Sequence, residues 1–314
     1  MLRRILSIVI LLSVAGCVAT DEQNNSPLEW NVIPLNPTNQ EQSQVGQLRY
    51  LGGLHIKSAD NQFGGVSGLQ WHQGRLYTVI DDGRWSSFEP IEDQEMLIGI
   101  RDVEIGILHG LQHEPLQGKA NSDAEALTRR ENGEWLVGFE RNHRVWRYSQ
   151  LSSEAQASGI DPVSLFGVLA ANSGVEALAS TPSGLIMCVE RSNQTNPNCV
   201  QLNDEGAEEI SVATPTALRS INGKVTDADT LSSGELVLLF RGYTAGEGSG
   251  AAIVVRTPDG LINNVAVLRP PLNVDNMEGL AIRESDGRRF IYIVSDNNFS
   301  PRQRTLLMKF ELIN

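Results

Sequence analysis

The chain has 314 residues and carries 38 acidic against 25 basic side chains, a formal net charge of −13 at pH 7. A surface this acidic repels nucleic acid and anionic lipid, so neither is expected as a direct partner of the folded part. The length is sufficient for one large globular domain.

The first seventeen residues have the pattern of an export signal. Arg3 and Arg4 precede an apolar run from Ile5 to Leu12, and Val14–Cys17 (VAGC) resembles the lipobox of bacterial lipoproteins. The apolar run is too short to cross a hydrocarbon core of about 30 Å. We therefore predict a lipoprotein signal peptide over residues 1–16.

The cysteine that follows this signal would become the lipidated first residue of the mature protein. A lipid on Cys17 would anchor the protein to a membrane without burying any of its fold. In lipoproteins resembling those of enteric bacteria an Asp after the cysteine favours the inner membrane. Here Val18 follows it, so we expect a bacterial cell-envelope location at the outer membrane, facing the periplasm. Residues 17–44 are rich in Asn, Gln, Pro and Glu and are predicted to form a flexible tether, followed by the folded domain at 45–314.

A repeat dominates the predicted domain. Five segments share a small or acidic start, an apolar strand, a Gly-containing turn, a second apolar strand and a polar end. They read GGVSGLQWHQGRLYTVIDDG, SDAEALTRRENGEWLVGFERN, SGVEALASTPSGLIMCVERSN, TDADTLSSGELVLLFRGY and DNMEGLAIRESDGRRFIYIVSDNN, with equivalent leucines at Leu69, Leu127, Leu178, Leu231 and Leu280. A period near 50 residues with short strands is typical of propeller blades. The sequence predicts an all-β, five-bladed propeller; a sixth blade in the long first interval, or a β-sandwich, remains an alternative.

Further strands complete the blades. In the first unit Met96–Ile105 and Leu108–Leu116 are predicted to be the third and fourth strands. The last unit ends one strand short, after Thr305–Leu312. We expect Gln47–Ile56, before the first hairpin, to supply the missing strand and so close the ring.

Hairpin topology predicts where the polar residues gather. In an antiparallel hairpin the start of the first strand lies beside the end of the second. All such positions should therefore meet at one mouth of the central channel. The start positions are Ser67, Glu125, Glu176, Asp229 and Glu278, and the end positions are Asp81, Glu140, Glu190, Arg241 and Asp296.

These positions comprise eight carboxylates, one hydroxyl and one guanidinium. The carboxylates would repel one another, which raises pKa values, unless a cation or interleaved arginines relieve the repulsion. Oxygen-rich sites suit hard cations, so we predict Ca²⁺ bound by a subset of the eight carboxylates. Salt bridges between blades are the alternative, and the adjacent pairs Glu140-Arg141 and Glu190-Arg191 fit it well.

Two further cysteines, Cys188 and Cys199, fall on facing strands of the third unit. Exported proteins meet an oxidising compartment, so we predict a disulfide between them; two buried thiols are the alternative.

The chain resembles the phytase-like family named for an esterase-like activity of phytase. The resemblance is carried by DNMEGLAIRESDGRRFIYIVSDNNFSPRQRTLLMKFEL, by GGVSGLQW with VIDDG, and by DAEALT with GFERN, and it covers roughly Gln47–Asn314. It implies a propeller, export, and hydrolysis of a phosphate or other ester. The matching positions are Glu125, Glu140, Glu278, Asp296 and Asn297.

Three functions remain open from the sequence. The first is a calcium-assisted hydrolase of a small-molecule ester or phosphoester, with Glu278 and Asp296 as catalytic candidates. Arg141, Arg191, Arg241 and Asn297 are its substrate-binding candidates. The second is a metal-dependent lactonase-like propeller. The third is an envelope protein that binds a ligand or partner without turnover.

Overall fold

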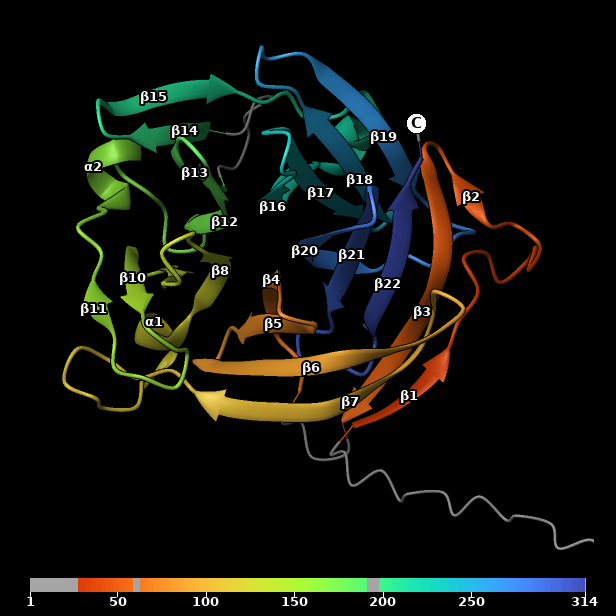
Figure 1. Ribbon diagram of the computed structural model, residues 1–314, viewed down its shortest axis with the longest axis horizontal. Helices are drawn as coiled ribbons and strands as arrows, with labels where there is room; N and C mark the ends of the chain where they lie inside the picture. Colours follow the sequence, from red (N-terminus) through yellow and green to blue (C-terminus); the bar gives the residue numbers. More distant parts are fainter. Residues whose placement is uncertain (1–27, 59–62, 191–197, 314) are drawn as a thin grey trace, which may run out of the picture.

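The computed structural model describes residues 28–58, 63–190 and 198–313. They form five antiparallel sheets arranged as blades around a central axis (Figure 1). The predicted five-bladed propeller is confirmed, and the described residues contain no sixth blade.

The chain builds each blade from the axis outwards. Blade 1 contains β4 (Val66–His72), β5 (Arg75–Ile80), β6 (Arg84–Asp93) and β7 (Met96–Ile107). Blade 2 contains β8 (Ala124–Arg129), β9 (Trp135–Phe139), β10 (Arg144–Tyr148) and β11 (Gln156–Ala157). Blade 3 contains β12 (Val175–Thr181), β13 (Gly184–Val189), β14 (Asn198–Asn203) and β15 (Gly206–Ser211). Blade 4 contains β16 (Lys224–Thr230), β17 (Leu236–Thr244), β18 (Gly248–Arg256) and β19 (Ile262–Leu268).

Blade 5 joins the two ends of the chain. Its strands are β20 (Asn276–Ser285), β21 (Arg288–Asp296), β22 (Thr305–Leu312), β3 (Leu48–Ser58) and β1 (Leu28–Val32), with β2 (Gln44–Val45) paired to β3. The register runs from Thr305 opposite Ile56 to Leu312 opposite Leu48. The predicted closure by an N-terminal strand is therefore confirmed.

The predicted tether is too long at its C-terminal end. Leu28–Val32 pairs with Leu54–Ser58, and the side chains of Leu28 and Leu35 are 3 % and 1 % exposed. The segment was predicted to be a tether because its composition is mostly polar. Its few apolar residues nevertheless bury against blade 5 and hold the segment there. The tether prediction therefore does not hold from Leu28 onwards.

The outer strands of blade 1 also differ from the prediction. Its third strand is β6, at Arg84–Asp93, and its fourth is β7, at Met96–Ile107. β6 contains Pro90, whose nitrogen cannot donate a hydrogen bond to a neighbouring strand. It is tolerated because the pairing of β6 with β5 ends at Phe88, before the proline.

The helical elements are short and lie in connections between strands. They are α1 (Lys119–Ser122), α2 (Pro162–Phe166) and the 3-10 helix η1 (Thr216–Ile221). No helix in the described part of the chain is long and apolar enough to span a membrane.

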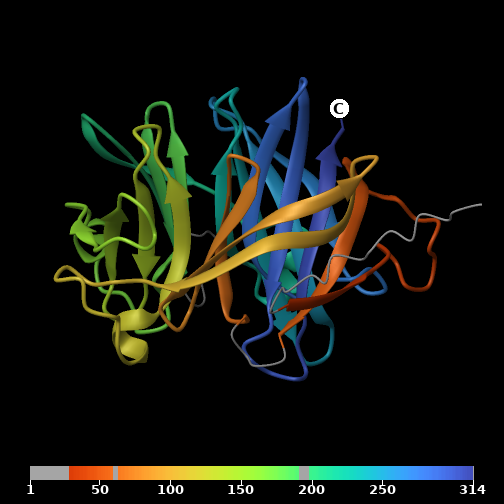
Figure 2. The same ribbon diagram turned by 60° about the horizontal axis from the view of Figure 1, so that its bottom comes forward.

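The long β6–β7 hairpin leaves blade 1 and crosses the side of blade 5 (Figure 2). At its tip a polar cluster joins the two blades. The ammonium of Lys309, only 1 % exposed, lies 2.9 Å from Glu92, and the hydroxyl of Tyr292 donates to the same carboxylate at 2.6 Å. A buried lysine is tolerated here because its charge is paired.

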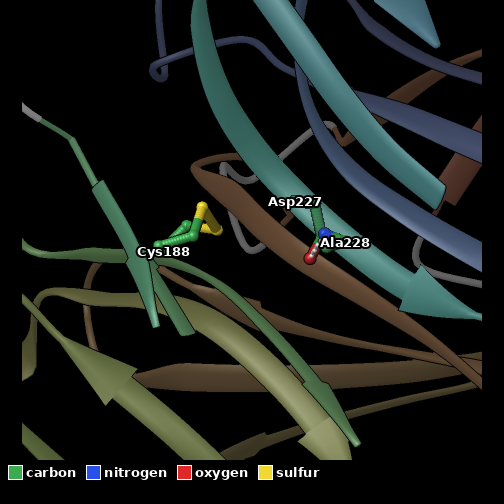
Figure 3. The surroundings of a disulfide bond; sticks show 4 residues. Cys188, Asp227 and Ala228 are labelled. Carbon is green, nitrogen blue, oxygen red and sulfur yellow. Dashed lines mark hydrogen bonds between the residues drawn. A yellow bond between two sulfur atoms is a disulfide. The ribbon is translucent and has the colours of Figure 1, made fainter. Parts of the chain in front are cut away.

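A buried carboxylate ties three blades together at the axis. Asp227 on β16 is 0 % exposed, and its Oδ2 accepts hydrogen bonds from the backbone N–H groups of Leu69 on β4, at 3.0 Å, and Leu280 on β20, at 2.6 Å. Its Oδ1 accepts from the N–H of Ala228 at 2.8 Å (Figure 3). Asp227 therefore joins inner strands that are far apart in the sequence.

The structure pairs Cys188 with Cys199 in a disulfide between β13 and β14, with the Cα atoms 4.1 Å apart. Both residues are buried in an apolar cluster that also includes Ala228 of β16. Figure 3 shows this disulfide facing the strand that carries Asp227 and Ala228.

Candidate functional site

At one end of the central axis the blades enclose a cavity of about 520 Å³, which we call the mouth. Every residue that lines it is charged or carries an amide or hydroxyl. The lining comprises Ser67, Asp81, Lys119, Asp123, Glu125, Glu140, Arg141, Asn172, Glu176, Glu190, Arg241, Asn276, Glu278, Asp296 and Asn298. Nine of the ten positions that hairpin topology assigned to one end of the channel thus lie together here; the exception is Asp229.

β-Bulges aim the first set of carboxylates into the mouth. The pairing of β8 with β9 shifts between Ala124 and Ala126, and the same shift occurs in β12 and β20, so the bulged residues are Glu125, Glu176 and Glu278. A bulge places one extra residue against its partner strand and redirects that residue's side chain. The first strand of each of these blades therefore presents a carboxylate at the same end of the axis.

Blade 4 breaks this pattern, and the placement of Asp229 at the mouth is wrong. Its bulged residue is Thr226, whose hydroxyl donates to the carbonyl oxygen of Met277 at 3.0 Å. In blade 4 the residue equivalent to the repeat leucines of the other blades is therefore Ala228. Leu231 is not equivalent to them. Asp229 lies further along β16 and lines a separate cavity of about 360 Å³ with Gln70.

The turns of the repeat contain the signal that would have corrected this register. If ENGEWLVGFE of blade 2 is aligned with SSGELVLLFR of blade 4, Glu140 matches Arg241 and Glu125 matches Thr226. The alignment on leucines shifted only the first strand of blade 4, by three residues. The position of Arg241 was therefore right and that of Asp229 was not.

A buried aspartate outside the predicted set of site residues holds two cations at the mouth. Asp123 is 1 % exposed; its Oδ1 lies 2.6 Å from Nζ of Lys119, and its Oδ2 lies 2.6 Å from Nε of Arg141. Lys119, in α1, also lies 2.7 Å from Asp81 of blade 1. Burial works against the charge on Lys119, but its hydrogen bonds to Asp123 and Asp81 raise its pKa above the ordinary value. The sequence could have indicated Asp123, because it lies in the repeat segment two residues before Glu125. It gave no signal for Lys119, which lies in a connection outside the repeat.

Cations also hold two of the predicted carboxylates. Nε of Arg241 lies 2.6 Å from Oε1 of Glu278, and the amide of Asn276 donates to the same oxygen at 2.7 Å. Lys224 forms an ion pair with Glu190. Burial raises the pKa of Glu278, while the neighbouring Arg241 opposes that rise.

Four lining carboxylates have no cationic partner among the described residues: Glu125, Glu140, Glu176 and Asp296. Burial, with the nearby charges of Asp123 and Glu140, raises the pKa of Glu125 well above its ordinary value. Burial, with the charges of Glu125 and Glu140, does the same for Glu176. Burial raises the pKa of Asp296 to about 7, against a 2.7 Å hydrogen bond from the N–H of Asn298. The mouth thus gathers carboxyl groups that its own cationic side chains leave unpaired.

This donor set fits a hard divalent cation. One carboxylate oxygen from each of Asp123, Glu125 and Glu140 lies within 4.8 Å of the other two. Calcium binds oxygen at about 2.3–2.6 Å, so two ligands on opposite sides of one ion are about 5 Å apart. Three oxygens at this spacing can therefore share a calcium ion, and Glu176 adjoins them through its hydrogen bond to Glu140.

Among the predicted substrate-binding residues, Arg141 and Arg241 line the mouth. Asn297 does not line it; its Oδ1 accepts a hydrogen bond from the N–H of Phe299 at 3.0 Å. Arg191 and Cys17 lie outside the described residues.

Comparison with known proteins gives a family. The family profile described as phytase-like, esterase-like activity of phytase, matches residues 61–299. No curated protein matches the sequence.

Solved structures match over most of this chain. A luciferin-regenerating enzyme is 8 % identical with a TM-score of 0.46, and the match covers 79 % of this chain and 92 % of that one. An exo-1,5-α-L-arabinanase from a bovine ruminal metagenomic library is 12 % identical with a TM-score of 0.46, over 78 % and 93 %. The β-xylosidase RS223 is 11 % identical with a TM-score of 0.47, over 83 % and 94 %. At these identities and scores the likeness says nothing about chemistry.

Proposed function

The chain belongs to the phytase-like family, and from this membership and its acidic mouth we propose that it hydrolyses an ester or phosphoester of a small molecule with the help of calcium. The observation that carries the proposal is the charge of the mouth. Eight carboxylates and three cations line one cavity, and four of the carboxylates have no cationic partner among the described residues. Such an arrangement costs folding free energy unless a ligand compensates it.

The cation would lie on the side of blades 2 and 3. Asp123, Glu125 and Glu140 offer the clustered oxygens, with Glu176 beside them. A bound calcium ion would supply Lewis-acid polarisation of the ester oxygen and would lower the pKa of a water molecule. It would also let an acidic protein accept an anionic substrate.

Residues of the chain would hold and orient that substrate. The Nη groups of Arg141 have no acceptor among the described residues, while Asp123 fixes its Nε at 2.6 Å. The guanidinium can therefore offer two parallel donors to a phosphate or carboxylate. Lys119 is 47 % exposed at its side chain and would add a second positive charge on the same wall.

Asp296 is the residue best suited to move a proton. A carboxyl group with a pKa of about 7 is poised to accept or release a proton at neutral pH. Glu278 is held between Arg241 and Asn276, which suits it to fix geometry more than to exchange protons.

The test is a hydrolase panel on the full-length protein in detergent, run with calcium and with a chelator. We expect turnover of a phosphomonoester or carboxyl ester that the chelator abolishes. Glu140→Gln should weaken calcium binding about tenfold or more and abolish metal-dependent turnover. Glu209→Gln, an exposed glutamate on the outer strand β15, is the matched control and should leave both unchanged.

Other outcomes would redirect the assignment. Turnover of lactones without phosphate esters would favour a lactonase-like enzyme, and tight ligand binding without turnover would favour a binding protein. If calorimetry of chelator-treated protein detects no calcium binding and millimolar calcium leaves the melting temperature unchanged, the calcium proposal is wrong.

We also propose that the mature protein is lipid-anchored at Cys17 and faces the periplasm from the outer membrane. The lipobox-like VAGC at residues 14–17 supports this. Mass spectrometry of the mature N-terminus should find a lipidated Cys17, and Cys17→Ser should abolish the modification. An intact N-terminus or an unmodified cysteine in the wild type would contradict it.

A further inference from the structure

An aromatic ring borders the mouth at a strained turn. Phe299 follows the end of β21 and is 36 % exposed, which is unusual for a phenylalanine. Its backbone has φ +49°, directly after Asn298 at +48°. Asparagine tolerates this left-handed region, whereas a bulky side chain rarely adopts it.

Neighbouring groups impose this conformation. Oδ1 of Asn297 accepts from the N–H of Phe299 at 3.0 Å, and the carbonyl oxygen of Asn297 accepts from the N–H of Ser300 at 2.7 Å. Oδ1 of Asp296 accepts from the N–H of Asn298 at 2.7 Å. Strain of this kind persists only where the surroundings over-determine it, and it concentrates at ligand sites.

Two glycines form the seat of the ring. A Cβ atom on Gly64 would lie 3.0 Å from Cδ1 of Phe299, and one on Gly65 would lie 2.6 Å from Cε2. The ring therefore packs directly on glycine backbone, and no other residue type would fit beneath it. The Cβ position of Gly65 is also 2.2 Å from Oδ1 of Asp81, a lining residue of the mouth. Ring and mouth are thus in immediate proximity.

The ring of Phe299 is apolar, whereas the residues that line the cavity are polar, and this difference suggests a role for the ring in binding. All lining residues of the mouth are polar, so the cavity offers little apolar surface to the uncharged part of an ester. Phe299 offers such a surface at the edge, and the guanidinium carbon of Arg84 lies 6.0 Å from its centroid. A planar or apolar group can rest on the ring while the charged group lies in the cavity.

We infer that Phe299 determines the specificity of the mouth, by favouring substrates in which the charged group carries a planar, apolar substituent. Asn297 is then a positioning residue that acts through Phe299. This inference rests on the proposed function, since it assumes that the mouth holds the substrate's anionic group.

The test compares two ligands that carry the same anion and differ in a ring. Phenylphosphonate and methylphosphonate are not ester substrates, so their affinities report binding alone; each is titrated by calorimetry into the full-length protein with calcium. We expect the wild type to prefer phenylphosphonate about tenfold, which corresponds to a stacking contact of about 1.4 kcal/mol. Phe299→Ala and Phe299→Leu should both bring the ratio to within about twofold.

Phe299→Leu separates recognition from packing, because leucine still covers the glycines but has no planar face. Asn297→Ala should lower the ratio, and Asn297→Asp should preserve it because a carboxylate oxygen can still accept from the N–H of residue 299. Leu261→Ala is the control. Leu261 is exposed in the turn between β18 and β19, at the end of blade 4 away from the mouth, so its substitution should leave the ratio unchanged.

Each possible result supports or contradicts the role of Phe299 in specificity. If the ratio in Phe299→Ala equals that of the wild type, or if the wild type does not discriminate between the ligands, the inference is wrong and the proposed function stands. If Phe299→Leu lowers only the melting temperature and keeps the ratio, the ring is structural. If the wild type binds neither phosphonate, the anion-holding mouth is refuted, and the role of Phe299 with it.

Discussion

Removal of the axial carboxylate by Asp227→Ala should destabilise the whole propeller. The substitution leaves the buried N–H groups of Leu69, Leu280 and Ala228 without their acceptor. Each unsatisfied buried donor costs about 1–2 kcal/mol, roughly 3–6 kcal/mol in total. Burial raises the pKa of Asp227 well above its ordinary value, so burying this carboxyl group itself costs folding free energy. Its removal recovers that cost and offsets part of the destabilisation. We expect a net loss of about 3 kcal/mol in the free energy of unfolding.

For a domain of this size such a loss lowers the melting temperature by about 6–12 °C. Urea unfolding followed by circular dichroism measures the free energy, and a thermal scan measures the temperature. Asp227→Asn keeps one oxygen that can accept from both Leu69 and Leu280, so its loss should be about 1 kcal/mol. Asp204→Ala changes an exposed aspartate between β14 and β15 and serves as the control. A wild-type free energy, within about 0.5 kcal/mol, in Asp227→Ala would refute the role of the axial carboxylate.

Three further predictions concern pH, the disulfide and ring closure. Burial raises the pKa of Asp229 to about 7, so the folded state keeps a proton that the unfolded state releases near pH 4, and stability falls as pH rises from about 4 to 7. This group alone should contribute about 2–3 kcal/mol between pH 5 and 8, and Asp229→Asn should flatten the pH dependence of urea unfolding by that amount; an unchanged slope would contradict it. Reduction of Cys188–Cys199, which closes a loop with a sequence separation of 11, should cost about 2–4 kcal/mol, and equal urea midpoints with and without reductant would argue against this. Deletion of residues 305–314 removes β22 and should abolish cooperative unfolding in calorimetry, whereas a deletion variant with full stability would disprove the closure.

Five blades and the closure of the ring could be predicted from the sequence. A repeat near 50 residues specifies one hairpin per blade, since each hairpin must bury its apolar faces against its neighbours. The apolar strand predicted before the first hairpin completes blade 5, where β3 pairs with β22. Convergence at the mouth follows equally, because antiparallel pairing fixes which strand ends meet.

The positions of single side chains depended on the tertiary structure. Glu125 and Thr226 occupy the same bulge in different blades, and a bulge adds a residue without any mark in an alternating pattern. The error at Asp229 had another cause: the alignment on leucines shifted the first strand of blade 4 by three residues and so placed Asp229 at the mouth, although β16 carries it to the cavity shared with Gln70.

The sequence also could not predict which residues from distant segments come into contact. Lys119 reaches Asp81 and Asp123 from a connection between blades, and Phe299 rests on Gly64 and Gly65 across the joint between the last and first blades. The local sequence records which groups can pair or pack. Which of them meet is decided by the angle at which each blade is set around the axis, because that angle arises from the packing of the apolar faces between blades.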